Sequence, residues 1–393
     1  MPEDRPTPRR GWLLPAVATL FLLLALAAAY LLFLDRQASF APALVLRAFP
    51  LHVLVLGLLA VVVLVLALLR RRVLPVVLAS LAVALTVVTG VTPVVAVQDV
   101  AGRVGADPGF GEYLANAARV NLGGPRPELT VRYASPGGHG LDLDVWPSVA
   151  PDSGKAVLLV HGGAWQSGTR SMTPEWNRLL TSLGFTVFDV EYRMTGDVPP
   201  GTAWQATVAD TKCALAWVTA NAAKYRVDPE RISVFGQSAG GHLALMTAYT
   251  SGTDAFRPSC DLPEGKVRTA VDFYGPFDLV AFATGPDSSA TGREILRTVL
   301  GGSVTEQNDR YRQFSPSSYV RPGLPPTLIL QGEDDYLMPR SQAHLLDDAL
   351  GRAGVPRQSV FLPYADHAFD ANWGSYQTQV ARAAVSGFLR ANG

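Results

Sequence analysis

Charged side chains are scarce in this sequence of 393 residues. They make up 17% of the chain and hydrophobic residues 48%, whereas soluble globular proteins are about one quarter charged. The shortage is concentrated before residue 99, where eight basic residues accompany three acids; the remainder carries 25 basic and 30 acidic residues. The zero net charge is therefore a cancellation of +5 and −5. Neither part is basic enough to indicate a nucleic-acid partner, and so apolar a chain is not mainly disordered.

Cysteine is also scarce, with only Cys213 and Cys260, both in the C-terminal part. In an oxidising compartment the two would form one disulfide, tying a helix to the loop 253–265. The alternative is two unrelated thiols, one of them in a helix core. The sequence leaves both open, because spacing does not tell whether the two residues approach each other.

Long apolar runs, in contrast, are present. Residues 11–34, 51–69 and 73–97 contain no Asp, Glu, Lys or Arg, and each run is near the roughly 20 residues that a helix needs to cross a bilayer. We predict three transmembrane helices, because these runs are too long for ordinary core helices. The first run has a second interpretation as a cleaved signal peptide, although its apolar stretch is longer than is usual for one.

The arginines orient these helices. Arg5, Arg9 and Arg10 precede the first run, and residues 70–72 are three arginines between the second and third, so both places should face the cytoplasm. The first connection holds only Arg36 and Arg47. Three crossings from a cytoplasmic N-terminus leave the chain after residue 98 outside the cytoplasm, and cleavage of the first run would not change this. We predict an integral protein of the cell membrane with an extracytoplasmic C-terminal domain.

That external part is expected to be a linker over residues 99–127, with a short helix near 111–120, followed by a folded domain over 128–393. Short strand patterns alternate there with helical patterns, which indicates an α/β domain with a mostly parallel sheet covered by helices on both faces. The expected strands are 129–134, 141–146, 156–161, 186–192, 232–236, 269–274, 327–331 and 359–363. The expected helices are 174–183, 204–225, 239–250, 342–353 and 376–391.

The strongest chemical signal is the sequence GQSAG at residues 236–240, directly after an expected strand and before an expected helix. In this setting G-x-S-x-G forms a sharp turn that exposes the serine hydroxyl. The flanking glycines fit because side chains there would collide with the neighbouring strand and helix. Ser238 is therefore the predicted nucleophile.

A second signal is HGGAW at residues 161–165, at the end of another expected strand. Acyl transfer builds negative charge on a carbonyl oxygen, which preorganised backbone N–H groups stabilise. The expected donors are Gly163 and Ala239, with Gly162 or Ala164 as further candidates. We expect His161 to support this loop.

A serine needs a base, and the base needs an acid to orient it. In such folds the chain order is Ser, then Asp or Glu, then His. The strand 327–331 is followed by three adjacent acids, of which Asp335 is the predicted partner and Asp334 the alternative. His367 directly follows the expected strand 359–363 and its short turn, and it is the predicted base.

The other histidines are expected to serve structure, namely His52, His139, His242 and His344. None has the spacing of a metal site such as H-E-x-x-H, so we predict no metal and no cofactor.

Together, LDLDVW at 141–146, HGGAW at 161–165, DVEYR at 189–193, GQSAGGHLA at 236–244, Asp335 and His367 resemble the α/β-hydrolase esterases. Within them the chain is similar to the branch of hormone-sensitive-lipase-like carboxylesterases, arylformamidases and bacterial feruloyl- or acetyl-esterase-like enzymes. The resemblance covers about residues 128–391 and leaves out the three apolar runs, which soluble members lack. Lipase-like members have a third glycine in this loop, whereas this chain has HGGAW. That difference points to the arylformamidase and feruloyl-esterase-like side.

The resemblance implies hydrolysis of a carboxylic ester through an acyl-enzyme, with Ser238, His367 and Asp335 as a triad. The expected partners are a small-molecule, lipid or glycan ester and the lipid bilayer. The segments 278–321 and 194–204 are where a lid or substrate wall would be inserted, although Phe282 and Tyr311 are equally suited to local packing. Two alternatives stay open: an acyltransferase or deacetylase acting on envelope glycans or lipids, and a non-catalytic membrane-anchored binding module.

Overall fold

The computed structural model describes residues 12–35, 50–116, 118–124, 127, 129–150 and 153–393. The chain divides into two compact units, Met1–Gln98 and Asp99–Gly393, which are described separately. Arg5, Arg9, Arg10, Arg36 and Arg47, on which part of the orientation argument depends, lie outside the described residues. So does the expected first residue of the folded domain, at position 128.

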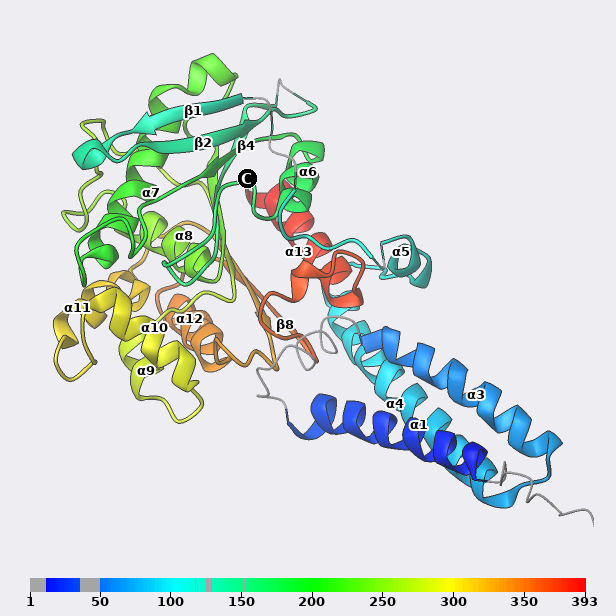
Figure 1. Cartoon of the computed structure of the whole chain (residues 1–393). Helices are drawn as coiled ribbons and strands as arrows, with labels where there is room; N and C mark the ends of the chain where they lie inside the picture. The colour runs from blue at the N-terminus through cyan, green and yellow to red at the C-terminus, as the bar shows by residue number, and fades with distance from the viewer. Residues whose placement is uncertain (1–11, 36–49, 117, 125–126, 128, 151–152) are drawn as a thin grey trace, which may run out of the picture. The chain divides into compact units, whose positions relative to one another are not determined.

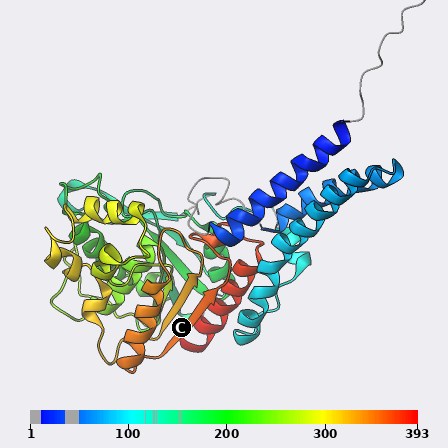
Figure 2. The same ribbon diagram turned by 90° about the horizontal axis from the view of Figure 1, so that it is seen from below.

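The first unit contains three apolar helices that run side by side (Figures 1 and 2). They are α1 (Leu13–Ala29), which continues as a π-helical turn over Tyr30–Leu34, α3 (Val53–Leu69) and α4 (Val73–Arg103). Two of them, Leu13–Leu34 and α4, are long and apolar enough to cross a membrane by length and composition. Helix α3 is a shorter apolar helix of 17 residues that follows a 3₁₀-helix over Pro50–His52, so the third crossing stays a prediction.

Small side chains fill the interior of this helical unit. Ala25, Ala60 and Ala82, one from each helix, are fully buried together. Helices α3 and α4 approach closely at Gly57, where an added Cβ would lie 2.6 Å from the hydroxyl of Thr86. That hydroxyl donates to the carbonyl of Ala82, one turn earlier, at 3.0 Å, so its hydrogen-bond partner lies in its own helix.

The second unit begins earlier than the expected domain. Residues 99–127 were expected to be a linker, yet α4 continues to Arg103, and α5 (Phe110–Ala115) lies in the described part that follows. The N–H of Asn121 donates to Ala371 at 2.7 Å, and Val120 forms an isolated β-bridge with Asn372. These contacts with the far end of the chain make the segment part of the folded unit.

An eight-stranded sheet forms the centre of the second unit, with strand order β1-β2-β4-β3-β5-β6-β7-β8. The strands are β1 (Leu129–Ala134), β2 (Leu141–Trp146), β3 (Lys155–Val160), β4 (Phe185–Val190), β5 (Ile232–Gln237), β6 (Ala270–Phe273), β7 (Thr327–Gly332) and β8 (Arg357–Leu362). β1 and β2 pair antiparallel, β2 joins β4 antiparallel, and the other pairs are parallel. All eight expected strands are present, with ends displaced by at most two residues, and the α/β class is confirmed.

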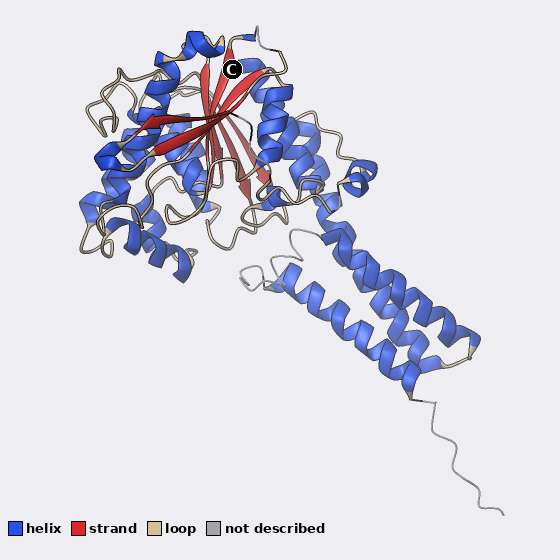
Figure 3. Ribbon diagram, turned by 45° about the horizontal axis from the view of Figure 1, so that its top comes forward, coloured by secondary structure: helices blue, strands red, loops and turns tan. Residues whose placement is uncertain are grey.

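Helices cover both faces of this sheet (Figures 1 and 3). On one face lie α6 (Pro174–Ser182) and α13 (Tyr376–Asn392); on the other lie α7 (Ala203–Ala220), α8 (Ala239–Thr250) and α12 (Ser341–Arg352). The central strands are therefore buried on both faces, which explains their continuous apolar runs. In β3, for example, Val157, Leu158 and Val160 are fully buried, and each such side chain contributes about 1.5–3 kcal/mol of hydrophobic stabilisation.

Three short helices lie between β6 and β7, where the sequence predicted an inserted segment but no helix. They are α9 (Leu279–Thr284), α10 (Ala290–Leu300) and α11 (Asn308–Gln313). Phe282 and Tyr311, the two aromatics of this insertion named from the sequence, belong to the main hydrophobic core at 2% and 1% exposure. Their role is local packing.

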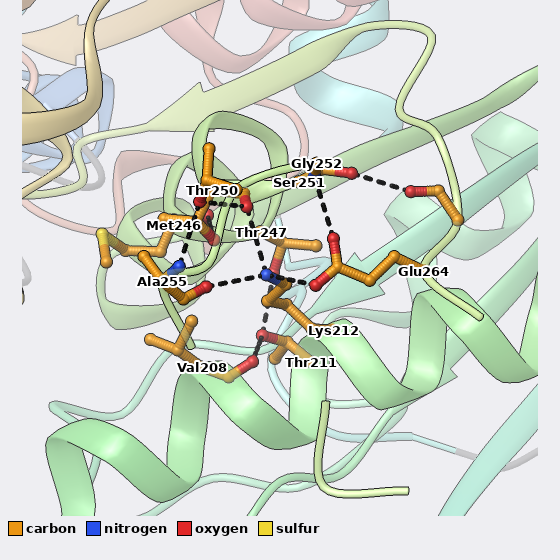
Figure 4. A network of polar contacts seen from close by, with 12 residues as sticks. Val208, Thr211, Lys212, Met246, Thr247, Thr250, Ser251, Gly252, Ala255 and Glu264 are labelled. Atoms are coloured by element: carbon orange, nitrogen blue, oxygen red, sulfur yellow. Dashed lines mark hydrogen bonds and ion pairs between the residues drawn. The ribbon is translucent and has the colours of Figure 1, made fainter. Parts of the chain in front are cut away.

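Cys213 and Cys260 form a disulfide that joins α7 to the loop 253–265. Beside it, the buried ammonium of Lys212 donates to the carbonyls of Thr250 and Ala255 at 3.1 and 3.0 Å and pairs with Glu264 at 2.7 Å (Figure 4). Burial lowers the pKa of Lys212, while Glu264 opposes that shift. The loop is thus fixed to α7 by one covalent and one ionic contact.

Candidate active site

Ser238 stands at a sharp turn between β5 and α8. Its backbone has φ 56° and ψ −121°, a conformation that costs a non-glycine residue about 1–3 kcal/mol and recurs at functional sites. The turn is held because the N–H of Ser238 donates to Phe273 at 2.8 Å and its carbonyl accepts from His242 at 3.0 Å. Position 240 must be glycine, since an added Cβ would lie 2.0 Å from the carbonyl oxygen of Val160.

His367 meets this serine from the loop after β8. Its Nε2 lies 3.0 Å from the Ser238 hydroxyl oxygen, and its Nδ1 lies 2.8 Å from Oδ2 of Asp335. Asp335 comes from the loop after β7. Because β5, β7 and β8 are parallel strands of one sheet, their carboxyl ends share an edge, and residues 129 positions apart in the chain come into hydrogen-bond contact.

The carboxylate of Asp335 is fully buried and held by its own loop. Its Oδ1 accepts from the N–H groups of Leu337 and Met338 at 2.9 and 2.7 Å, and its Oδ2 accepts from the side-chain amide of Gln331 at 3.2 Å. Of the two acids considered from the sequence, Asp335 is the one whose carboxylate bonds His367. The backbone N–H of Asp334 donates to Ala365.

Three carboxylates act on the imidazole of His367. Burial alone would lower the pKa of His367, but the Asp335 carboxylate outweighs it, with Asp366 and Asp370 adding to the effect, and the pKa is raised above its usual range. The backbone N–H of His367 donates to Asp366 at 2.7 Å, which fixes the loop. A histidine in this setting can take a proton from Ser238 and be stabilised as a cation.

The HGGAW loop lies against the same turn. Gly162, Gly163 and Ala164 line the cleft in which Ser238 and His367 lie. Gly163 has φ +120° and would place a Cβ 2.0 Å from the carbonyl oxygen of Ser167, so this position requires glycine. Ala239, the remaining expected N–H donor, is the first residue of α8; it is 1% exposed and is not among the residues that line the cleft.

His161 supports this loop from below. Its ring stacks on Tyr192 with centroids 4.4 Å apart, and its Nδ1 lies 2.7 Å from the carbonyl of Gly162. Burial lowers the pKa of His161 to about 4, which keeps the ring neutral. His242 is likewise buried, with a pKa lowered to about 3 by burial, and its Nε2 lies 2.6 Å from the carbonyl of Phe314.

The cleft has a volume of about 340 Å³ and a largely apolar wall. Its apolar side chains are Leu122, Ala164, Met172, Ile295, Leu337, Ala368 and Ala371. The expected wall segment 278–321 contributes Ile295, whereas the segment 194–204 contributes none of the lining residues. Asn121 and Leu122 come from the segment that the sequence assigned to a linker.

Sequence reasoning missed a buried carboxylate beneath the site. Asp370 accepts hydrogen bonds from the Tyr274 hydroxyl and the Trp176 indole, both at 2.6 Å, and from the side-chain amide of Gln237. Burial raises the pKa of Asp370, while these donors oppose the shift. No motif marks Asp370; the only available signal was its position three residues after His367.

No group of three or more metal-ligating side chains lies within the described ranges. The fold and the arrangement of its loops define an α/β-hydrolase. A family model for BD-FAE matches residues 141–350, and the chain belongs to the BD-FAE family.

Two relatives from Mycobacterium tuberculosis are 32% identical to this chain: the esterase LipQ, over 65% of this chain and 60% of its own length, and the probable carboxylic ester hydrolase LipM, over 64% and 58%. The chain thus spans about 60% of the length of the curated relatives it matches. Among solved structures, esterase 2 of Thermogutta terrifontis is similar with a TM-score of 0.52 and 27% identity, covering 62% of this chain and 86% of that one. Its butyrate-bound form aligns with a TM-score of 0.53 and 26% identity, covering 64% and 90%.

Proposed function

We propose that this protein is a membrane-anchored serine carboxylesterase. The observation that carries the proposal is the hydrogen-bonded series Ser238, His367 and Asp335, in which Ser238 and His367 line an apolar cleft. The names of the relatives, esterase and carboxylic ester hydrolase, agree with this chemistry.

In the proposed reaction, His367 removes the hydroxyl proton of Ser238 as the oxygen attacks the ester carbonyl. Asp335 holds the imidazole in the required tautomer and stabilises the cation. The imidazolium then gives the proton to the departing alcohol, leaving an acyl group on Ser238. Water, deprotonated by the same histidine, attacks that acyl group, and the carboxylic acid is released.

Negative charge on the carbonyl oxygen would be stabilised by backbone N–H groups of the HGGAW loop and by that of Ala239. Their position supports the role: Gly162 lies against the serine turn, where an added Cβ would be 2.8 Å from the carbonyl oxygen of Gln237. Removing a single donor of this kind elsewhere costs about 3–4 kcal/mol of barrier, so the loop is a major part of the proposed catalysis.

The substrate class we propose is a carboxylic ester with an apolar part that fits the cleft. The surface of the cleft is mostly apolar, and Ser238 and His367 are among the residues that line it. The Thermogutta esterase was solved with butyrate bound, which is compatible with a carboxylate product in a cleft of this fold.

Membrane anchoring is supported by the pattern of the helical unit. Its interior holds small residues, whereas large apolar side chains point outward: Leu23, Leu58 and Val62 are 58%, 68% and 56% exposed. Small residues at helix contacts and large ones outside are typical of helices packed in lipid. We propose that α1, α3 and α4 span the cell membrane with residues 70–72 in the cytoplasm, which leaves the hydrolase unit outside.

The disulfide supports the same placement, because such bonds persist mainly in oxidising compartments. A C-terminal fusion to a reporter active only outside the cytoplasm should give signal, whereas activity of a cytoplasm-only reporter would reject the orientation. Cleavage of the first apolar run would leave this expectation unchanged.

Hydrolysis is tested with p-nitrophenyl esters of increasing acyl length on the purified full chain. We expect release of p-nitrophenol by the wild type and at most residual release by Ser238→Ala. A panel that also holds acetylated and feruloylated sugars and an N-formyl aromatic amide would rank the substrate classes. Equal rates for wild type and variant would reject the proposal.

A further inference from the structure

The described residues 109–116 and 118–123, called the segment 109–123 below, lie outside the part of the chain that matches the BD-FAE model. It runs along residues 371–379: the N–H of Gly109 donates to the side chain of Gln379 at 2.8 Å, and the N–H of Trp373 donates to the carbonyl of Arg119 at 3.2 Å. The segment is therefore fixed to the chain that follows the histidine loop.

One side of this segment is buried and the other is not. Tyr113 and Asn121 are 4% and 0% exposed. The other large apolar side chains are exposed by half or more, namely Phe110 (54%), Leu114 (57%), Val120 (51%) and Leu122 (50%). We call these four residues the apolar rim.

The geometry of the segment groups the rim residues in pairs. Phe110 and Leu114 are one helical turn apart on α5 and therefore share a face. Val120 and Leu122 are exposed on either side of buried Asn121, the alternation expected when neighbouring side chains point to opposite faces. Neighbouring exposed apolar side chains of this kind are typical of binding surfaces.

The chain itself indicates what covers the rim. α4, a candidate membrane span, ends at Arg103, and six residues separate it from Phe110 at the start of α5. Phe110 is seven residue steps from Arg103, which reach at most about 25 Å, so the rim begins close to the end of the helix that would leave the bilayer. An exposed apolar face at that distance is suited to the boundary between headgroups and acyl chains.

The rim also leads into the cleft. Leu122 is both a rim residue and part of the wall of the cleft that contains Ser238, and Met172, Ile295 and Leu337 are further apolar residues of that wall. We infer that the apolar rim docks on the bilayer surface, and that the substrate is a lipid ester whose apolar part resides in that bilayer. This inference rests on the proposed esterase function and deepens it by naming the substrate class.

The test uses the full chain reconstituted in phosphatidylcholine vesicles that contain some phosphatidylglycerol. A long-chain acyl ester of 4-methylumbelliferone in the vesicle membrane serves as the bilayer-resident substrate, and p-nitrophenyl acetate as the soluble one. The double variant Phe110→Asp with Leu114→Asp changes the rim without touching the cleft. Val149→Asp is the matched control, because Val149 is 72% exposed in the same unit and lies outside the rim.

For the double variant we expect turnover of the bilayer-resident ester to fall by at least about tenfold, because two carboxylates oppose insertion of the rim. Turnover of p-nitrophenyl acetate should stay within about twofold of the wild type, and the control should resemble the wild type on both substrates.

Three results would overturn the inference: unchanged turnover of the bilayer-resident ester, equal losses on both substrates, or loss of a dimer in the double variant, which would assign the rim to a second copy. Failure of the wild type to hydrolyse p-nitrophenyl acetate would instead reject the proposed function. The two failures are therefore distinguishable.

Discussion

The hydroxyl of Tyr274 donates a hydrogen bond of 2.6 Å to Asp370 while its ring lies 4.7 Å, centroid to centroid, from the imidazole of His367. Tyr274 thus connects the proposed base to a buried carboxylate. The same carboxylate accepts from Gln237, the residue before Ser238. Asp370 therefore connects the loop that carries His367 to the turn that carries Ser238.

Tyr274→Phe should weaken both stability and turnover. It leaves Asp370 short of one donor, and loss of a buried hydrogen bond to a charged group costs about 1.5–3 kcal/mol. We expect a lower unfolding temperature and a kcat several times lower, with KM little changed, as measured by thermal unfolding and ester kinetics.

Tyr249→Phe is the control for this change, because the Tyr249 hydroxyl is also buried and lies 3.0 Å from that of Thr327, outside the cleft. It should cost about 1 kcal/mol of stability and leave kcat unchanged. If Tyr274→Phe lowers kcat no more than this control does, Tyr274 has no positioning role.

Asp335→Asn should reduce kcat/KM far more than Asp334→Asn. The asparagine cannot stabilise the imidazolium, and the corresponding change in a serine protease lowers kcat by about 10⁴. Asp334→Asn should stay within about tenfold of the wild type, because the carboxylate that bonds His367 is retained. Steady-state kinetics of both variants give the answer, and the opposite ranking would assign the acid to Asp334.

The pH dependence of kcat/KM should follow His367. Only the neutral imidazole can accept the serine proton, so activity falls as pH falls through the pKa of His367. Asp335 raises that pKa, and we therefore expect half-maximal kcat/KM at a pH above the ordinary histidine value of about 6.5. A pH profile on p-nitrophenyl acetate measures it. If kcat/KM is instead half-maximal at a pH well below the ordinary histidine pKa, Asp335 does not act on His367 as the structure indicates.

Removal of the disulfide should lower stability and spare catalysis. The bond closes a loop with a sequence separation of 47, for which the chain-entropy model gives about 4 kcal/mol. The variant Cys213→Ala with Cys260→Ala should unfold at a lower temperature but hydrolyse esters normally at room temperature, because neither cysteine lines the cleft. Unchanged unfolding would show that the Lys212 and Glu264 contact alone holds the loop.

The sequence predicted the sheet well because its strands carry strong local patterns. β2 and α8 begin and end at the predicted residues, the first through alternation beside a turn and the second through the serine turn before it. The helix α10 was missed, although Ser289 caps its start by accepting from the N–H of Gly292 and Gly301 ends it with φ 74°. Both signals are local features of the sequence.

The contacts of residues 109–123 could not be predicted in the same way. They join positions about 270 apart, as between Gly109 and Gln379, and no local pattern encodes such a pairing. Asp370 was missed for a related reason, since its partners Tyr274, Trp176 and Gln237 lie on three separate elements. The proposed triad could be predicted from the sequence because each member follows a recognisable strand.

The central claim is that Ser238 is the nucleophile of a serine hydrolase. Treatment of the full chain with a fluorophosphonate probe, followed by mass spectrometry of its peptides, tests this most directly. The account predicts one adduct, on Ser238, that is absent from Ser238→Ala and strongly slowed in His367→Ala. Labelling of Ser238→Ala at the wild-type rate, or an adduct on another serine, would contradict it.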